Sequence, residues 1–349
     1  MRENQPFGLG FVGCGSYSQN LAAAAADSPH LRLSACYDVD HERACAFADR
    51  HGMDAHKNLP ELLGRDDVHG LVIATPNNAH RENVEAGAAA GKHVFVDKPI
   101  ANTIEDALAM IAAADRAGVT LAVGHNTRRT GAHRTLKRMI DAGAVGVPVT
   151  VEANFSHSGG LGLAPGQWRF YRDECPGLPL MQLGVHFADT VQYLLGDVIE
   201  VSSFMSHVAT PADNNDVTVS ILKFADGLLG YLGSNYASPP VYYVNVYGTG
   251  GNLYCEGGGR LRYRKADTAE AEEVTVEAVN TQREELEEFA ECARTGRKPE
   301  VDGGSALKAL AVVRAALSSH EEGRPVTTAR VISEGGGNKW LTDCGVSTR

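Results

Sequence analysis

A short apolar run that ends in a glycine turn is the feature that most constrains this sequence. Residues 9–12 are apolar or glycine, and Gly13-Cys14-Gly15-Ser16-Tyr17-Ser18 follows them in the order Gly-x-Gly-x-x-Ser. In a dinucleotide-binding loop the first glycine permits the tight turn, the second lets backbone approach a pyrophosphate, and a small third residue lets helix pack on strand. An ordinary strand–turn–helix junction has the same pattern, so the turn alone leaves both interpretations open.

Strand and helix patterns alternate after this turn. We expect strands at 9–12, 31–37, 70–74, 93–96 and 119–123, and helices ending at 26 and at 41–51, 78–90 and 103–117. This alternation predicts a parallel sheet covered on both faces, and right-handed crossovers make it doubly wound. The sequence therefore predicts an NAD-binding Rossmann domain over residues 1–125.

The pattern changes in the second part of the chain. Helices are expected at 130–142, 182–195, 282–295 and 305–322, and strands at 147–155, 198–207, 217–224, 228–234, 242–247, 252–256, 261–265 and 273–277. Several of these strands alternate apolar and polar residues, which is typical of an antiparallel sheet with two different faces. We expect residues 126–349 to form an α+β domain with a large, open, mostly antiparallel sheet. The tail from 333 to 349 gives no clear pattern.

Composition narrows the class of protein. The formal net charge is −11, which argues against a nucleic-acid partner. The seven cysteines are odd in number and form no Cys-x-x-Cys pair, which disfavours a disulfide framework or zinc knuckle and fits a reducing compartment. No run of about eighteen apolar residues occurs. We expect a soluble, cytoplasmic protein without a membrane partner and without a metal site.

Asp38 is the first candidate for cofactor selectivity. It closes the second expected strand, 23 residues after Gly15. A carboxylate there can accept hydrogen bonds from the adenosine ribose hydroxyls and would repel a 2′-phosphate, which favours NAD over NADP. Asp38 or Asp40 could instead simply cap the following helix.

Two further loops follow parallel strands, where ligands bind in such folds. Thr75, Pro76, Asn77 and His80 follow one strand and are candidate cofactor contacts, although Asn77 could act only as a helix cap. Asp97 and Lys98 follow the next strand, near the expected place of a nicotinamide. Pro99 favours an extended backbone at Lys98. A solvated surface lysine is the alternative.

A helical segment in the second part carries a third candidate cluster. Gln182, His186 and Asp189 are spaced to share a helix face. An amide, an imidazole and a carboxylate together could orient a polyol and move a proton. A capped helix with a hydrogen-bonded core histidine has the same spacing.

Together these segments resemble the glucose–fructose oxidoreductase / inositol dehydrogenase (Gfo/Idh/MocA) family from about residue 7 to 326. The matching segments are 12–15, 37–40, 74–80, 91–99, 143–148, 168–169, 184–186 and 322–326. The resemblance implies a Rossmann domain and an α/β domain whose sheet backs the active site and often mediates oligomerisation. A homodimer or homotetramer is thus expected. It also implies hydride transfer between a nicotinamide cofactor and a secondary alcohol or ketone of a sugar, cyclitol or sugar derivative.

The resemblance also implies residue roles. Asp97-Lys98-Pro99 matches the family's Glu-Lys-Pro, which makes Lys98 the catalytic lysine, and His186 matches the family's histidine. Trp168-Arg169 looks like the family's Trp-Arg pair, which lies on a loop near the nicotinamide. Candidate contacts for substrate hydroxyls are, besides Lys98 and His186, the residues Asn126, Arg128, Tyr171 and Gln182.

Gln182 departs from the inositol dehydrogenase pattern, which has Asp at this place. Because an amide takes up no proton at neutral pH, the expected acid/base is His186, with Lys98 stabilising charge on the substrate oxygen. The missing carboxylate leaves two alternatives open: a non-catalytic sensor of NAD, and a NAD-dependent lyase or glycosidase that oxidises its substrate transiently. A metal-dependent hydrolase has little support, since no ligand cluster stands out.

Overall fold

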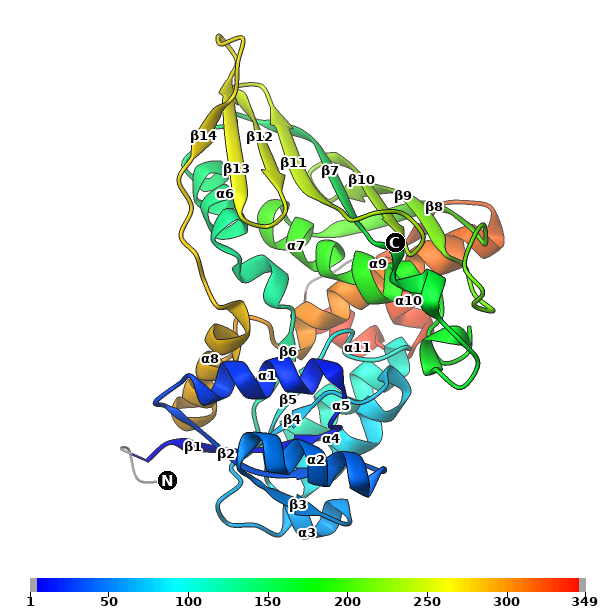
Figure 1. Cartoon of the computed structure of the whole chain (residues 1–349). Coiled ribbons are helices and arrows are strands. Elements are labelled where there is room, and N and C mark those ends of the chain that lie inside the picture. Colours follow the sequence, from blue (N-terminus) through cyan, green and yellow to red (C-terminus); the bar gives the residue numbers. More distant parts are fainter. Residues whose placement is uncertain (1–4, 345–349) are drawn as a thin grey trace. The chain divides into compact units, whose positions relative to one another are not determined.

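The computed structural model describes residues 5–344 and divides the chain into two compact units (Figure 1). The first comprises residues up to Ala101, Asp106–Asn126 and Asn280–Ala306, and the second comprises Asn102–Glu105, Thr127–Val279 and the residues from Leu307 on. Residues 1–4, and 345–349 of the tail that gave no pattern, lie outside the described range.

A six-stranded parallel sheet forms the centre of the first unit. Its order is β3-β2-β1-β4-β5-β6, which confirms the predicted doubly wound class. Strands β1 and β4–β6 are almost entirely apolar and buried, as a sheet covered on both faces requires. The strands are β1 (Phe7–Val12), β2 (Leu31–Tyr37), β3 (Asp54–His56), β4 (Gly70–Ile73), β5 (His93–Asp97) and β6 (Leu121–Gly124).

The helices around this sheet agree with the expected ones except at the edge. Strand β3 and helix α3 were not predicted, because three and five residues are too few to show a period. Asn58 marks the start of α3 by accepting a hydrogen bond from the Glu61 amide at 3.0 Å. The helices are α1 (Ser16–Ala26), α2 (His41–His51), α3 (Leu59–Leu63), η1 (Asn77–Ala79), α4 (His80–Ala89) and α5 (Ile104–Ala117).

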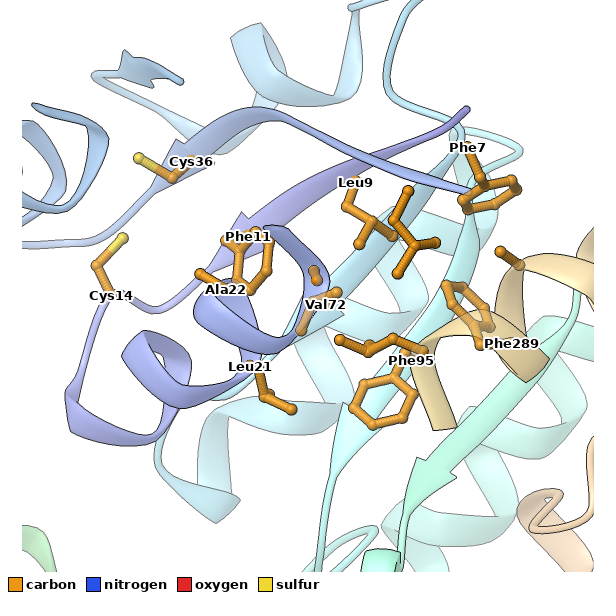
Figure 2. Close-up of a cluster of buried hydrophobic side chains, with 14 of the residues drawn as sticks. Phe7, Leu9, Phe11, Cys14, Leu21, Ala22, Cys36, Val72, Phe95 and Phe289 are labelled. Atoms are coloured by element: carbon orange, nitrogen blue, oxygen red, sulfur yellow. The ribbon is translucent and has the colours of Figure 1, made fainter. Parts of the chain in front are cut away.

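Helix α8 (Thr281–Thr295) also belongs to the first unit, although it lies far along the chain. Figure 2 shows Phe289 of α8 beside Phe95 and Phe7, and the ring centroids lie 6.0 and 5.7 Å apart respectively. Leu286 and Phe289 are fully buried in this core. The first unit therefore contains a segment beyond the predicted domain boundary at 125/126. The apolar face of α8 completes the core of the parallel sheet.

The second unit is built on a nine-stranded sheet of order β14-β13-β12-β11-β7-β10-β9-β8-β15. All neighbours pair antiparallel except β7 and β10, so the mostly antiparallel prediction is confirmed. The strands are β7 (Pro148–Ser156), β8 (Val198–Ser206), β9 (Val217–Phe224), β10 (Leu229–Asn235), β11 (Val241–Gly248), β12 (Gly251–Glu256), β13 (Arg260–Lys265), β14 (Glu272–Val274) and β15 (Val326–Thr327).

Helices α6 (Gly131–Asp141) and α7 (Val185–Leu195) lie against one face of this sheet (Figure 1). A π-helical turn, η5 (Leu180–Gly184), comes directly before α7, where a continuous α-helix was expected from 182. Helix α9 (Gly303–Glu322) lies near its predicted bounds, and α10 (Thr328–Glu334) and α11 (Asn338–Asp343) supply structure in the tail that gave no pattern. No helix within residues 5–344 is both long and apolar enough to cross a bilayer.

Candidate active site

The glycine turn connects β1 to α1 through a tight turn that only glycine adopts without strain. Gly13 has φ 87°, and a Cβ there would lie 3.0 Å from the Ala74 carbonyl oxygen and from Thr75 Cγ2. Only glycine fits both conditions. Ser18, fully buried, donates from Oγ to the Gly13 carbonyl at 2.5 Å. The serine that replaces the third glycine therefore stabilises the turn.

The N-terminus of α1 fits the phosphates of a dinucleotide. Gly15 occupies the N-cap position, where no side chain caps the helix, and no described atom lies within 4 Å of the place a Cβ would take. The first-turn amides of an α-helix have no partner inside the helix and attract anions. Open space and uncapped amides together leave a cradle at Gly15 and Ser16 that backbone alone can offer to a phosphate.

Asp38 joins the end of β2 to the glycine turn. Its Oδ2 accepts the Cys14 amide at 2.8 Å, and its Oδ1 accepts the Asp40 amide at 2.9 Å. Arg43 donates from Nη1 to Oδ1 at 3.1 Å. Asp40, not Asp38, caps α2 by accepting the Arg43 amide at 3.2 Å. The capping alternative for Asp38 is thus excluded, and its carboxylate lies beside the loop that carries Gly15.

The side chains of Cys14 and Tyr17 point into the protein. Cys14 is 2% exposed, and its thiol donates to the Tyr37 carbonyl at 3.7 Å. A hydrogen bond with Cys36, together with burial, raises the pKa of the Cys14 thiol. Burial, with the charges of Asp97 and Glu285 adding to it, raises the pKa of Tyr17. The cofactor contacts predicted at these two positions would therefore come from backbone.

His80, a predicted cofactor contact, lies inside the first unit. The imidazole is fully buried, with Nδ1 3.1 and 3.2 Å from the carbonyl oxygens of Pro99 and Ile100, and Nε2 3.1 Å from that of Thr75. Burial lowers the pKa of His80. The ring thus ties the loop after β4 to the segment that follows Lys98, and its contact with a cofactor stays a prediction.

Lys98 follows directly after β5, whose last residue is Asp97. Asp97 pairs in register with Gly124 of β6, so Lys98 leaves the sheet at the carboxyl ends of two buried parallel strands. Asn77 and Pro76 lie at the end of the neighbouring strand β4, where Asn77 begins η1 and is almost completely buried. The structure therefore brings the predicted cofactor loops to one edge of the sheet, the edge where ligands bind in open α/β sheets.

His186 lies in the first turn of α7 and is only 9% exposed. Its Nδ1 is 2.9 Å from Oγ1 of Thr127, and its ring lies 5.8 Å from that of Phe155 on β7. The imidazole is thereby held on two sides by residues from distant parts of the chain. Neither neighbour was named as a site residue from the sequence.

Asp189, which the spacing places on the same helix face as His186, pairs with Arg128 instead. Its carboxylate is completely buried and forms a two-pronged ion pair with Arg128, in which Nε donates to Oδ2 at 2.7 Å and Nη2 donates to Oδ1. The Arg128 guanidinium also lies 5.1 Å from the centroid of the Tyr193 ring. Substrate contact by Arg128 stays a prediction.

The remaining predicted residues of the second unit are Trp168, Arg169, Tyr171 and Gln182, and Gln182 contacts Arg169. Its Oε1 accepts Arg169 Nε at 3.2 Å, and its Nε2 lies 3.4 Å from Cys175 Sγ. Arg169 also stacks over the ring of Trp168 at 4.3 Å. Tyr171 is one-third exposed, and its hydroxyl accepts the Gly166 amide at 3.1 Å. Gln182, Trp168 and Arg169 therefore form one cluster.

Asn126, the last of the predicted substrate contacts, belongs to the first unit. Its Nδ2 donates to Oγ1 of Thr281, at the start of α8, at 3.2 Å. The roles of all these residues toward a cofactor or substrate stay predictions.

His133, which was not predicted from the sequence, forms a hydrogen bond with the backbone of Thr127. Its Nδ1 donates to the Thr127 carbonyl at 2.8 Å, and the ring is fully buried against Phe187 and Tyr242. The available signal was the position of Thr127 three residues after β6, in a loop at the carboxyl end of a parallel strand. Nothing local in the sequence points to His133.

Burial makes His133 a source of acid sensitivity. It lowers the pKa of His133 from 6.5 to about 4. Between these values an unfolded chain binds a proton that the folded chain does not, so stability is complete above pH 6.5 and falls as the pH drops toward 4. The expected loss from this residue at pH 4.5 is about 2–3 kcal/mol.

His133→Asn, which keeps a donor near the place of Nδ1 but takes up no proton, tests this expectation. Urea unfolding at pH 7 and pH 4.5 gives the change in unfolding free energy for each protein. The variant is expected to lose about 2–3 kcal/mol less than the unmodified chain over this interval. An equal loss in both proteins would show that His133 is not the group responsible.

The first unit is a dinucleotide-binding domain in fold and in the chemistry of its loops. Residues 7–125 match the family model described as "Oxidoreductase family, NAD-binding Rossmann fold", and residues 133–254 match the one described as "GFO/IDH/MocA C-terminal domain". The chain belongs to the Gfo/Idh/MocA family of oxidoreductases. The resemblance found in the sequence motifs is thereby confirmed.

Three relatives illustrate the similarity. The D-apiose dehydrogenase of Paraburkholderia graminis is 31% identical over 93% of this chain and 90% of its own. A putative NADPH-dependent oxidoreductase from Desulfitobacterium hafniense has a crystal structure with TM-score 0.90 and 36% identity, covering 94% of this chain and 99% of its own. The aldose-aldose oxidoreductase of Caulobacter crescentus, complexed with glycerol, has TM-score 0.85 and 26% identity, covering 93% of this chain and 100% of its own.

Proposed function

We propose that this oxidoreductase transfers a hydride between a nicotinamide cofactor and a secondary alcohol or ketone of a sugar, cyclitol or sugar derivative. The observation that carries the proposal is Lys98 at the carboxyl end of β5, at the ligand-binding edge of a dinucleotide-binding sheet. A second group able to exchange a proton, His186, is held in place in the second unit. The identity with a D-apiose dehydrogenase over nearly the whole chain supports a sugar-like substrate.

NAD is the proposed cofactor, and when bound it accepts or supplies the hydride. Gly13, Gly15 and the first turn of α1 would hold its phosphates, and Asp38 would accept hydrogen bonds from ribose hydroxyls. A 2′-phosphate would meet the carboxylates of Asp38 and Asp40, against the single guanidinium of Arg43 that bonds both. This balance favours NAD, while a relative labelled NADPH-dependent makes the comparison of both cofactors part of the test.

The proposed chemistry assigns the proton to His186 and the developing charge to Lys98. In the oxidising direction His186 accepts the proton of the substrate hydroxyl, and the Lys98 ammonium donates a hydrogen bond to the same oxygen. Positioned acid/base groups of this kind contribute about 10²–10⁴-fold to rate. Gln182 can orient a hydroxyl through its amide but takes no part in proton transfer.

A homo-oligomer is proposed on the basis of the second unit's sheet. Phe204, Val219, Ile221 and Leu229 lie on one face of β8, β9 and β10 and are 77%, 40%, 49% and 51% exposed. Adjacent apolar side chains of this size, exposed on a sheet face, are typical of an interaction surface. A second copy of the chain is the partner that the family expectation suggests.

Incubation with a panel of sugars and cyclitols tests the function, with reduced-cofactor absorbance followed separately for NAD and NADP. We expect reduction with at least one polyhydroxylated substrate and faster turnover with NAD. Binding of NADH without turnover of any substrate would favour the sensor, which the missing carboxylate at Gln182 suggests. Product release without net NADH would favour the lyase. Light scattering on the same preparation is expected to give a mass above 37.1 kDa.

A further inference from the structure

The hydrogen bond between Thr127 and His186 joins two buried side chains of the second unit. Oγ1 of Thr127 and Nδ1 of His186 are 2.9 Å apart, and the two residues are 7% and 9% exposed. A contact this short between buried polar groups fixes the orientation of the ring. It also joins residues 59 positions apart in the chain.

Thr127 is itself held rigidly. It lies in η2 (Asn126–Arg129), and its carbonyl accepts Nδ1 of His133 at 2.8 Å and the Thr130 amide at 3.2 Å. His133 is fully buried between the rings of Phe187 and Tyr242. The hydroxyl of Thr127 is therefore presented to His186 by a packed support rather than by a mobile loop.

The Thr127 hydroxyl can accept the hydrogen bond that joins it to His186. A threonine hydroxyl has one hydrogen and two lone pairs. With its own hydrogen directed away from the ring, Oγ1 presents lone pairs to His186 and accepts a hydrogen bond from Nδ1–H.

We propose that Thr127 is a positioning residue that accepts the Nδ1–H of His186 and so holds the imidazole in the tautomer whose Nε2 can take up a proton. The inference rests on the proposed function and deepens it. The same bond survives proton uptake, because Nδ1 keeps its hydrogen in the imidazolium. The opposite arrangement, in which Thr127 donates to Nδ1, would place the hydrogen on Nε2 and leave His186 unable to act as a base.

Two other polar groups near His186 in sequence have partners of their own. Asp189 is paired with Arg128, and Gln182 bonds Arg169 and Cys175. Gln182 occupies the place where the inositol dehydrogenase pattern has a carboxylate. In this chain Thr127 is thus the residue that holds the hydrogen on Nδ1 of the His186 ring.

The test compares Thr127→Val with Thr127→Ser, and uses Thr190→Val as the matched control. Thr190 is another buried threonine beside His186, but its Oγ1 donates to the His186 backbone carbonyl at 2.8 Å. Long-range ¹H–¹⁵N NMR of ¹⁵N-histidine-labelled full-length protein reports which ring nitrogen carries the hydrogen. His186→Gln identifies the His186 signals.

We expect the Nδ1–H tautomer of His186 in the unmodified protein, Thr127→Ser and Thr190→Val, and a mixture of tautomers in Thr127→Val. With an active substrate, Thr127→Val is expected to lower kcat about tenfold, the effect of one hydrogen bond, with KM for NAD unchanged and a shifted pH profile. Thr127→Ser is expected to keep the kcat and the pH profile of the unmodified protein.

An Nδ1–H signal that is unchanged in Thr127→Val would overturn the proposal. Equal losses of activity in Thr127→Val, Thr127→Ser and Thr190→Val would overturn it as well, because they would show general damage to packing. The NMR measurement needs no substrate. A chain that lacks dehydrogenase activity but shows the expected tautomers would contradict the proposed function and leave the assignment of Thr127 standing.

Discussion

Replacing Lys98 by alanine is expected to lower kcat by about 10²–10⁴-fold while NAD still binds. This range corresponds to about 3–5 kcal/mol of transition-state stabilisation. The physical reason is that charge develops on the substrate oxygen as its proton leaves, and a positioned ammonium stabilises that charge more than it stabilises the neutral hydroxyl. Cofactor affinity is expected to change little, because the phosphate cradle at Gly15 is formed by backbone.

Lys92→Ala is the matched control, because it removes a lysine next to the opposite end of the same strand. Lys92 precedes β5, and its Nζ donates to the carbonyls of Arg65 and Val68 at 2.8 and 2.9 Å. This variant is expected to unfold at lower temperature but to keep its kcat. NADH binding by fluorescence and turnover on the substrate found in the screen separate the two effects. Near-normal turnover of Lys98→Ala would refute the catalytic assignment.

The fold of the first unit could be predicted largely because its signals are local. A buried parallel strand such as β4 is an unbroken apolar run, and the glycine turn after β1 needs a residue that tolerates φ 87°. Short elements such as β3 lack a period. The position of α8 depends on Phe289 meeting Phe7 and Phe95 across almost the whole sequence, which no local pattern shows.

The candidate site divides in the same way. Asp38 and Lys98 could be found because each follows an expected strand, and loops at such ends bind ligands. The contacts of Thr127 with His186 and of Arg128 with Asp189 join residues about sixty positions apart. The π-helical turn before α7 also changes the helix face that regular spacing assigned to Gln182 and His186. Sequence patterns therefore predict candidate site residues more readily than the residues that contact them.

Breaking the buried ion pair of the second unit is the change expected to cost the most stability. Asp189→Ala removes the carboxylate that pairs with the buried Arg128 guanidinium, whose side chain is 9% exposed. Loss of one partner from a buried pair typically destabilises a protein by about 3–5 kcal/mol. Urea unfolding of the full chain, followed by circular dichroism, measures the loss of unfolding free energy.

Two comparisons show whether the cost comes from breaking this buried ion pair. The double variant Arg128→Met with Asp189→Leu is expected to recover much of the loss, because it leaves neither charge buried. Asp141→Ala breaks the ion pair of Asp141 with Lys137 on α6, where Asp141 is mostly exposed, and is expected to cost less than about 1 kcal/mol. If Asp189→Ala were no more destabilising than Asp141→Ala, the Arg128–Asp189 pair would not be a main support of the helix that carries His186.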